Sequence, residues 1–227
     1  METNSFKLAA SLICADVLNL EKEIERINQS GCDYIHFDVM DGVFVPRFGL
    51  FPEILKYVKS KTNLPIDVHL MIVEPEKHLK MFYDAGADII NVHVEACTHL
   101  HRTIGLIKSF GIQSGVTLNP ATPLSSLDYV LDDIDIVQLM AINPGIVGHK
   151  LIPSIMNKIS DLKTLIDNKG KDIFIEIDGG VSPESAAQMI KNGASILVCG
   201  NSTIFKPDSP VDVKTKEFIS LLKSQGC

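Results

Sequence analysis

Eight short apolar runs alternate with amphipathic stretches along the chain, and this alternation limits the possible folds more than any other feature. The runs are rich in strand-forming residues and cover residues 7–13, 34–40, 65–72, 89–95, 113–119, 136–142, 173–178 and 196–200. The stretches between them include residues 20–29, 76–85, 100–110, 155–167 and 183–192, and a closing helix is expected within residues 214–227. Strands that alternate with helices pair in parallel, so the sequence predicts an α/β fold.

The nearly regular spacing of these units predicts a closed (β/α)8 TIM barrel. The strand ends, taken as residues 14, 40, 71, 95, 119, 142, 178 and 201, lie 23 to 36 residues apart. A doubly wound open sheet is the alternative, but Cys14-Ala15-Asp16-Val17 follows the first strand, where that fold would carry a glycine-rich turn. No linker or change in composition divides the chain, so a single TIM-barrel domain is expected over residues 1–227.

Charge and cysteine usage exclude several classes of protein. The formal net charge is -7 and no dense Lys/Arg run occurs, which argues against a nucleic-acid partner. The five cysteines are widely spaced and form no CxxC pair, which favours reduced thiols and a cytoplasmic location. The N-terminus lacks a basic region and Asp16 interrupts the apolar stretch after it, so neither export nor a membrane partner is expected.

Imidazole and carboxylate groups recur two residues apart near the ends of the second and third strands. His36 and Asp38 share one strand face, as do Asp67 and His69, while Asp178 ends the seventh strand. In a barrel these strand ends surround one opening, where His36, Asp38, His69 and Asp178 suit a divalent metal ion. Zinc fits this donor set best, and Fe2+, Mn2+ and Co2+ are not excluded by ligand type. The alternative is that each is a buried polar residue satisfied by the backbone.

A third pair of this kind, His93 and Glu95, lies near the end of the fourth strand. We expect it to line the site or to support a ligand rather than to bind the metal directly. Methionines also gather at strand ends, namely Met40, Met71 and Met140, either as core filling or as a cover that excludes water.

Glycines follow the last three strands in three separate loops. They are Gly145-Ile146-Val147-Gly148, Gly179-Gly180 and Gly200-Asn201-Ser202. Backbone amides in such loops bind phosphate without net positive charge, and barrels frequently carry a phosphate site here. The sequence therefore predicts a small phosphorylated ligand.

With these residues in place, the chain resembles the ribulose-phosphate 3-epimerase family over nearly its whole length. The motifs that carry the resemblance are residues 11–16 (SLICAD), 36–46 (HFDVMDGVFVP), 67–71 (DVHLM), 143–145 (NPG) and 176–180 (EIDGG). The resemblance implies a metal-dependent barrel of the ribulose-phosphate-binding type that inverts C3 of a ketose phosphate. It would interconvert D-ribulose 5-phosphate and D-xylulose 5-phosphate, in the pentose phosphate pathway of carbohydrate metabolism, and it suggests a homo-oligomer.

Carried over position by position, the resemblance makes His36, Asp38, His69 and Asp178 the metal ligands, and Asp38 and Asp178 also the acid/base pair. The residues expected to bind substrate are Ser11, Met40, His69, Met71, Met140, Gly145, Ile146, Val147, Gly148, Asp178, Gly179, Gly180, Gly200, Asn201 and Ser202. The chemistry agrees, because a proton beside a ketone is only weakly acidic and its removal needs stabilisation of the enediolate oxygen. Carboxylates on well-separated strands can then serve opposite faces of the carbon.

Departures from the family pattern fall at the substrate end of the site. Arg47 replaces the usual asparagine, residues 48–51 differ, Val147 stands where a small residue is typical, His149 replaces a glutamine and Asn201 replaces a serine. A 3-epimerase acting on another ketose phosphate, such as D-allulose 6-phosphate, is therefore an alternative.

Other classes of function fit less well. Related phosphate-binding barrels use an Asp-x-Lys-x-x-Asp motif on the third strand, but this chain has Asp67, His69 and Ile72 at those positions. A Schiff-base aldolase would need a lysine near the site, for which Lys150 is the candidate. A non-catalytic sugar-phosphate binding protein is the remaining alternative, but it does not account for paired carboxylates beside metal-type histidines.

Overall fold

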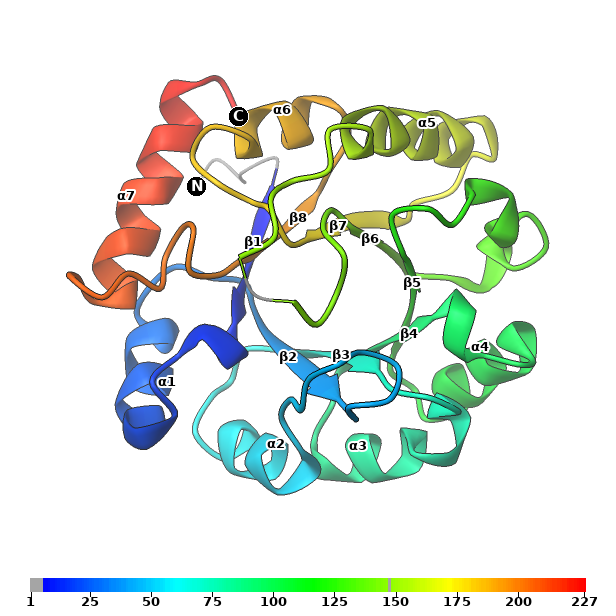
Figure 1. Cartoon of the computed structure of the whole chain (residues 1–227), viewed down its shortest axis with the longest axis horizontal. Coiled ribbons are helices and arrows are strands. Elements are labelled where there is room, and N and C mark those ends of the chain that lie inside the picture. Colours follow the sequence, from blue (N-terminus) through cyan, green and yellow to red (C-terminus); the bar gives the residue numbers. More distant parts are fainter. Residues whose placement is uncertain (1–5, 147) are drawn as a thin grey trace.

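The computed structural model describes residues 6–146 and 148–227, and in it eight parallel strands close into a barrel (Figure 1). Each strand pairs with its neighbours in sequence order, and β1 closes the barrel against β8. The strands are β1 Lys7–Ser11, β2 Tyr34–Met40, β3 Ile66–Met71, β4 Ile89–His93, β5 Gln113–Leu118, β6 Ile136–Met140, β7 Phe174–Asp178 and β8 Ile196–Cys199. The predicted (β/α)8 barrel is confirmed.

Helices form an outer ring around the strands (Figure 1). In α1, Ile24 and Ile27 are fully buried. Acidic residues occupy its first turn, where their negative charge interacts favourably with the positive end of the helix dipole. α2 begins with Pro52, whose fixed φ suits the first helical position. The helices are α1 Leu20–Asn28, α2 Pro52–Lys59, α3 Leu79–Ala85, α4 Leu100–Ser109, α5 Ile155–Asn168, α6 Ala186–Lys191 and α7 Val211–Ser224. None of the helices in the described ranges is both long enough and apolar enough to cross a bilayer.

The structure corrects several predicted element boundaries. β1 and β4 end two residues earlier than expected, because residues 12–14 and 94–96 turn into short 3-10 helices. No α-helix follows β5 in the described chain; two 3-10 helices, Leu124–Leu127 and Leu131–Asp133, take its place. Pro120 and Pro123 disfavour a helix that begins before residue 124, since proline lacks an amide hydrogen and disfavours helical backbone in the residue before it.

Alternation along β2 separates the core from the site. Ile35, Phe37 and Val39 belong to the large apolar core that includes the helices, whereas Tyr34 belongs to a small cluster inside the barrel. His36 and Asp38 lie on the same face as Tyr34, so the strand directs both side chains into the barrel. The barrel interior thus changes along its axis from an apolar layer to a polar one.

The loop after β2 folds back along the strand and lies over the barrel in Figure 1. Gly49 donates its amide to the Met40 carbonyl (3.1 Å) and Leu50 donates to the Asp38 carbonyl (2.8 Å). An antiparallel bridge between Asp41 and Phe48 continues this pairing. The loop is therefore held against the strand end that carries Asp38.

Replacing Gly49 with Ala is expected to destabilise the protein by about 1–3 kcal/mol, because an added methyl group overpacks this contact. A Cβ at position 49 would lie 2.7 Å from both the Asp38 carbonyl oxygen and the Met40 nitrogen. The melting temperature should fall. The control is Gly105→Ala in α4, where a Cβ meets nothing within 4 Å and helix propensity predicts a gain of about 0.8 kcal/mol. An unchanged melting temperature in Gly49→Ala would contradict the close approach of loop and strand.

Candidate active site

His36, Asp38, His69 and Asp178 converge at the carboxyl ends of β2, β3 and β7. One ligand atom from each side chain lies within 4.8 Å of the others. His69 Nδ1 lies 3.3 Å from both Asp38 Oδ1 and Asp178 Oδ2, and His36 Nε2 lies 3.3 Å from Asp38 Oδ1. The parallel register places Asp38 beside His69 on the neighbouring strand. The four side chains predicted from the sequence therefore form one cluster.

The cluster has the donor set of a metal site. His36 is fully buried, yet its Nε2 atom has no hydrogen-bond partner among the described residues. A buried polar atom without a partner is costly, and coordination of a cation would satisfy it. Two imidazole nitrogens and two carboxylate oxygens are ligands that zinc accepts, and ligand type alone also admits iron(II), manganese and cobalt. These residues can therefore bind a metal ion.

Electrostatics also favour a cation at this position. Burial opposes charge on both histidines, but Asp38 and Asp67 outweigh it and raise the pKa of His36 well above its usual value. Burial likewise acts against His69, but Asp178 and Asp38 raise its pKa to about 9. The carboxylates thus favour positive charge between them, whether on a ring nitrogen or on a metal ion.

Asp67 supports the cluster instead of joining it. Its Oδ2 lies 2.7 Å from His36 Nδ1, on the opposite edge of the ring from the four-residue cluster. Asn91 donates from Nδ2 to Asp67 Oδ1 (2.6 Å) and to Glu176 Oε2 (3.4 Å). Burial and the neighbouring Asp67 raise the pKa of Glu176 to about 8. The contact between Asp67 and His36 orients the His36 ring so that Nε2 faces the cluster.

His69 has a different supporting group. Its Nε2 lies 2.9 Å from His93 Nε2, and His93 Nδ1 lies 3.2 Å from Glu95 Oε2. Burial lowers the pKa of His93 to about 4. The structure therefore places His93 and Glu95 behind His69, in the position of the supporting pair that the sequence suggested.

Sequence reasoning did not assign a role to Asn91 or Gln138. Gln138 donates from Nε2 to Asp178 Oδ2 (3.3 Å) and accepts at Oε1 from the hydroxyl of Thr117 (2.8 Å). These residues face the barrel interior from β4, β5 and β6. The alternation of side chains along each predicted strand, which places His36 and Asp38 inside the barrel, is the signal that identifies them.

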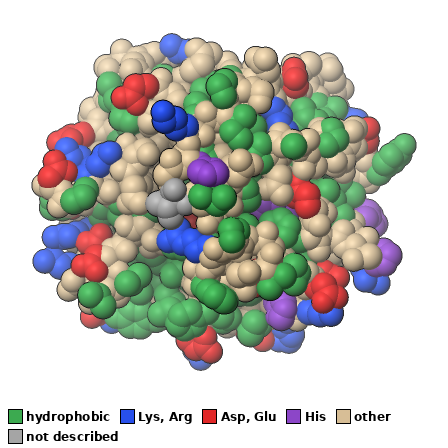
Figure 2. All heavy atoms as spheres, in the orientation of Figure 1, with side chains coloured by type: hydrophobic (Ala, Val, Ile, Leu, Met, Phe, Trp, Pro, Cys, Tyr) green, Lys and Arg blue, Asp and Glu red, His purple; other side chains and the backbone are tan. Residues whose placement is uncertain are grey.

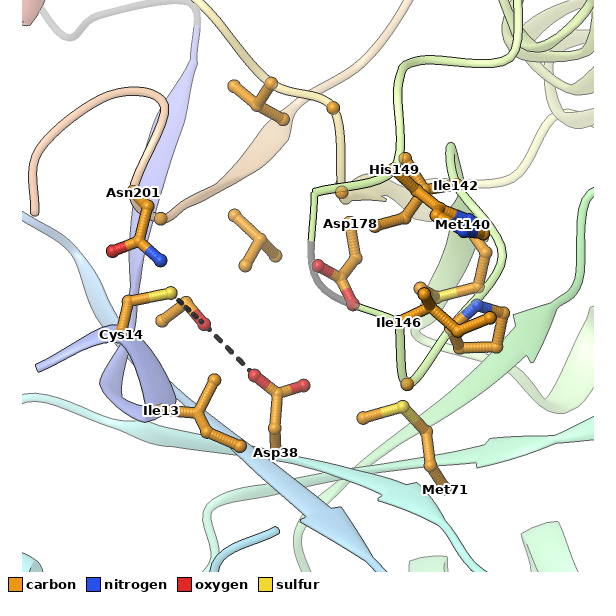
Figure 3. A pocket seen from close by; sticks show the side chains of 18 of the residues that line it. Ile13, Cys14, Asp38, Met71, Met140, Ile142, Ile146, His149, Asp178 and Asn201 are labelled. Atoms are coloured by element: carbon orange, nitrogen blue, oxygen red, sulfur yellow. Dashed lines mark hydrogen bonds between the residues drawn. The ribbon is translucent and has the colours of Figure 1, made fainter. Parts of the chain in front are cut away.

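A cavity of about 350 Å³ opens above the cluster, and the carboxyl groups of Asp38 and Asp178 project into it (Figure 3). Of the residues expected to bind substrate, His69 is fully buried and does not line the cavity, and Val147 falls outside the described residues. The others line the cavity, namely Ser11, Met40, Met71, Met140, Gly145, Ile146, Gly148, Asp178, Gly179, Gly180, Gly200, Asn201 and Ser202. Their role in binding stays a prediction. Lys150 is exposed and is not a lining residue, which disfavours a Schiff-base mechanism.

The turn after Asp178 depends on glycine. Gly179 and Gly180 both have left-handed φ angles, 84° and 65°, which other residues rarely adopt. A Cβ on Gly179 would also lie 2.3 Å from Ile142 Cγ1. The chain can therefore turn sharply away from Asp178 beside the cavity.

Acidic and basic side chains are interspersed over the face shown in Figure 2, without a continuous basic area.

A closed parallel barrel with ionisable groups and a cavity at the carboxyl ends of its strands has the organisation of a TIM-barrel enzyme. The model of the "Ribulose-phosphate 3 epimerase family" matches residues 7–205. The chain therefore belongs to the ribulose-phosphate 3-epimerase family and is an enzyme of that family.

Two curated relatives illustrate the extent of the likeness. The chain is 49% identical over 203 residues to a ribulose-phosphate 3-epimerase of Bacillus subtilis (strain 168), covering 89% of this chain and 94% of that protein. It is 44% identical over 209 residues to a chloroplastic ribulose-5-phosphate-3-epimerase of Arabidopsis thaliana, covering 91% and 74%.

Solved structures with low identity share the fold alone. KGPDC from Streptococcus mutans superposes with a TM-score of 0.72 at 13% identity, over 96% of this chain and 98% of that chain. The 3-hexulose-6-phosphate synthase from Salmonella typhimurium gives 0.69 at 15% identity, over 97% and 100%.

Proposed function

We propose that this protein interconverts D-ribulose 5-phosphate and D-xylulose 5-phosphate by inverting C3 through two-base proton transfer. The observation that carries the proposal is the convergence of Asp38 and Asp178 on one cavity, beside two histidines with metal-ligand geometry. Family membership supports the reaction class. The five unpaired cysteines are consistent with a cytoplasmic enzyme, and the reaction places it in the pentose phosphate pathway.

His36, Asp38, His69 and Asp178 would hold one divalent cation, for which we propose Zn2+. When bound, the cation supplies Lewis-acid stabilisation of the negative charge that develops on the substrate during proton removal. The remaining chemistry belongs to protein side chains.

Asp38 and Asp178 carry the proton. Asp38 comes from β2 and accepts a hydrogen bond from the Ser11 hydroxyl (3.0 Å), while Asp178 comes from β7 and accepts one from Gln138 (3.3 Å). One carboxylate removes the C3 proton, leaving an enediolate, and the other, in its acid form, delivers a proton to the opposite face. The direction of reaction decides which aspartate acts as the base.

The glycine loops and the methionines at the strand ends would orient the substrate. The glycine loops after β6, β7 and β8 would hold the phosphate group through backbone amides. Met40, Met71 and Met140 are at least nine-tenths buried and border the cavity, where they would exclude water from the enediolate. This arrangement would hold C3 between the two aspartates.

The reaction is tested by incubating the metal-loaded protein with D-ribulose 5-phosphate in deuterated water and following C3 by proton NMR. We expect loss of the C3 proton signal together with formation of D-xylulose 5-phosphate. D-allulose 6-phosphate is the comparison substrate, because Arg47 and His149 differ from the family pattern and both line the cavity. A higher kcat/KM with D-allulose 6-phosphate would reassign the substrate, whereas binding without exchange at C3 would indicate a non-catalytic protein.

A further inference from the structure

Arg47 is the single arginine or lysine among the described residues that line the cavity. The same cavity contains the carboxyl groups of Asp38 and Asp178, which would repel a phosphate dianion. Backbone amides in glycine loops carry only partial charges. A full positive charge in the cavity wall therefore has an electrostatic consequence for any anionic ligand.

The loop after β2 fixes the backbone of Arg47 at the cavity. The Arg47 carbonyl accepts a hydrogen bond from the Gly42 amide (3.0 Å), and the Arg47 amide donates to the Val45 carbonyl (2.8 Å). The adjacent bridge between Asp41 and Phe48 anchors both sides of the loop. A backbone held in this way limits the positions that the side chain can reach.

The guanidinium group of Arg47 has no carboxylate partner among residues 6–146 and 148–227. The nearby Asp41 carboxylate is occupied, because it accepts hydrogen bonds from the amides of Val43, Phe44 and Val73, each at 2.8 Å. Arg47 is nevertheless half-buried. Its charge is therefore free to bind a ligand.

The loop that carries Arg47 also touches the proposed phosphate loop. A Cβ on Gly145 would lie 2.5 Å from Val45 Cβ, so the two loops are in close contact. Gly145, Ile146 and Gly148 line the same cavity as Arg47. The arginine thus shares this cavity with the backbone that would hold the phosphate, and its own loop contacts that backbone through Val45.

From this geometry we infer that Arg47 binds the phosphate group of the substrate and determines the preference for phosphorylated over free ketoses. The inference rests on the proposed function and adds to it a side-chain cation that binds the phosphate group. Arginine suits this role, because its planar fork donates two parallel hydrogen bonds to a phosphate group.

Substitution of Arg47 with Met is expected to raise the KM for D-ribulose 5-phosphate about tenfold, equivalent to about 1.4 kcal/mol. The kcat should change less than about threefold, since the lost contact is the same in ground and transition states. With unphosphorylated D-ribulose, kcat/KM should not change. Arg47→Lys should recover part of the loss, because lysine keeps the charge but not the fork.

Isothermal titration calorimetry with inorganic phosphate supplies a readout that does not depend on turnover. Phosphate should bind Arg47→Met about tenfold more weakly than the unmodified protein. Weaker phosphate binding without any epimerisation would sink the proposed function but leave the role of Arg47 intact. The matched control is Arg102→Met, which removes an exposed arginine from α4 and should change neither measurement.

The inference fails if the KM and the phosphate affinity of Arg47→Met stay within about twofold of the unmodified values. It also fails if D-ribulose turnover falls as much as D-ribulose 5-phosphate turnover, because the residue would then act on the reacting carbon. Should Arg47→Met not fold by circular dichroism, Arg47→Asn, which removes the charge and keeps a polar side chain at this half-buried position, provides the same comparison.

Discussion

Asp178→Asn is expected to lower kcat for epimerisation by about 10²- to 10⁴-fold, the range that a positioned acid or base contributes. Asparagine keeps the shape of aspartate but cannot accept or donate the proton. Asp38→Asn should cause a loss of similar size, because inversion needs one competent carboxylate on each face of C3. Kinetic assays in both directions with D-ribulose 5-phosphate and D-xylulose 5-phosphate measure the effect.

The two variants can be distinguished from simple loss of the site. In deuterated water each should still exchange the C3 proton of the epimer that faces its remaining aspartate, without forming the other epimer. The two variants should therefore exchange opposite epimers. Metal content and melting temperature are measured in parallel, and Asp161→Asn, an exposed change in α5, serves as the control. Near-normal turnover in either variant refutes the two-base assignment.

The metal-type cluster could be predicted because its geometry is local. His36 and Asp38 lie two residues apart on a strand, and this spacing alone directs both into the barrel. β2 also kept its predicted bounds, residues 34–40, because it is a run of strand-forming residues in which the polar His36 and Asp38 alternate with Ile35, Phe37 and Val39. In a TIM barrel the active site lies at the carboxyl ends of the strands, and this rule adds His69 and Asp178 to the predicted cluster.

Alternation along each strand can identify the residues beneath the cluster, but not their contacts, because these depend on the register between neighbouring strands. Asn91 pairs with His69 on one side and with Gly115 on the other. Gly115 leaves space for the Asn91 side chain, since a Cβ there would lie 1.5 Å from Asn91 Oδ1. From local sequence alone, a glycine in a strand predicts a weaker strand. The role of Gly115 becomes clear only from the pairing of β4 with β5.

Local sequence also does not predict which ring nitrogen of each histidine faces the cluster. His36 presents Nε2 to the cluster and Nδ1 to Asp67, whereas His69 presents Nδ1 to the cluster and Nε2 to His93. The two rings therefore have supports of different charge, a buried carboxylate and a largely neutral imidazole. A carboxylate behind a ligand raises its basicity, so Asp67 should matter for metal affinity.

Removal of metal with a chelator is expected to abolish epimerisation, and adding back a divalent cation should restore it. The reason is that the C3 proton is too weakly acidic to be removed without stabilisation of the enediolate oxygen. Metal should also stabilise the fold, by about 2.7 kcal/mol at a free concentration one hundred times the Kd. Calorimetric titration of Zn2+, Fe2+, Mn2+ and Co2+ into the chelated protein would rank the candidate ions.

Asp67→Asn tests the support for this site separately from the chemistry. Loss of the carboxylate behind His36 Nδ1 is expected to weaken metal affinity by about 10- to 100-fold, measured by competition with a chromophoric chelator. At saturating metal the variant should recover most of its turnover, because Asp38 and Asp178 remain. Asp128→Asn, an exposed position after β5, is the control and should bind metal normally. Full activity in chelated, metal-free protein would contradict the metal site, and unchanged affinity in Asp67→Asn would contradict its support by Asp67.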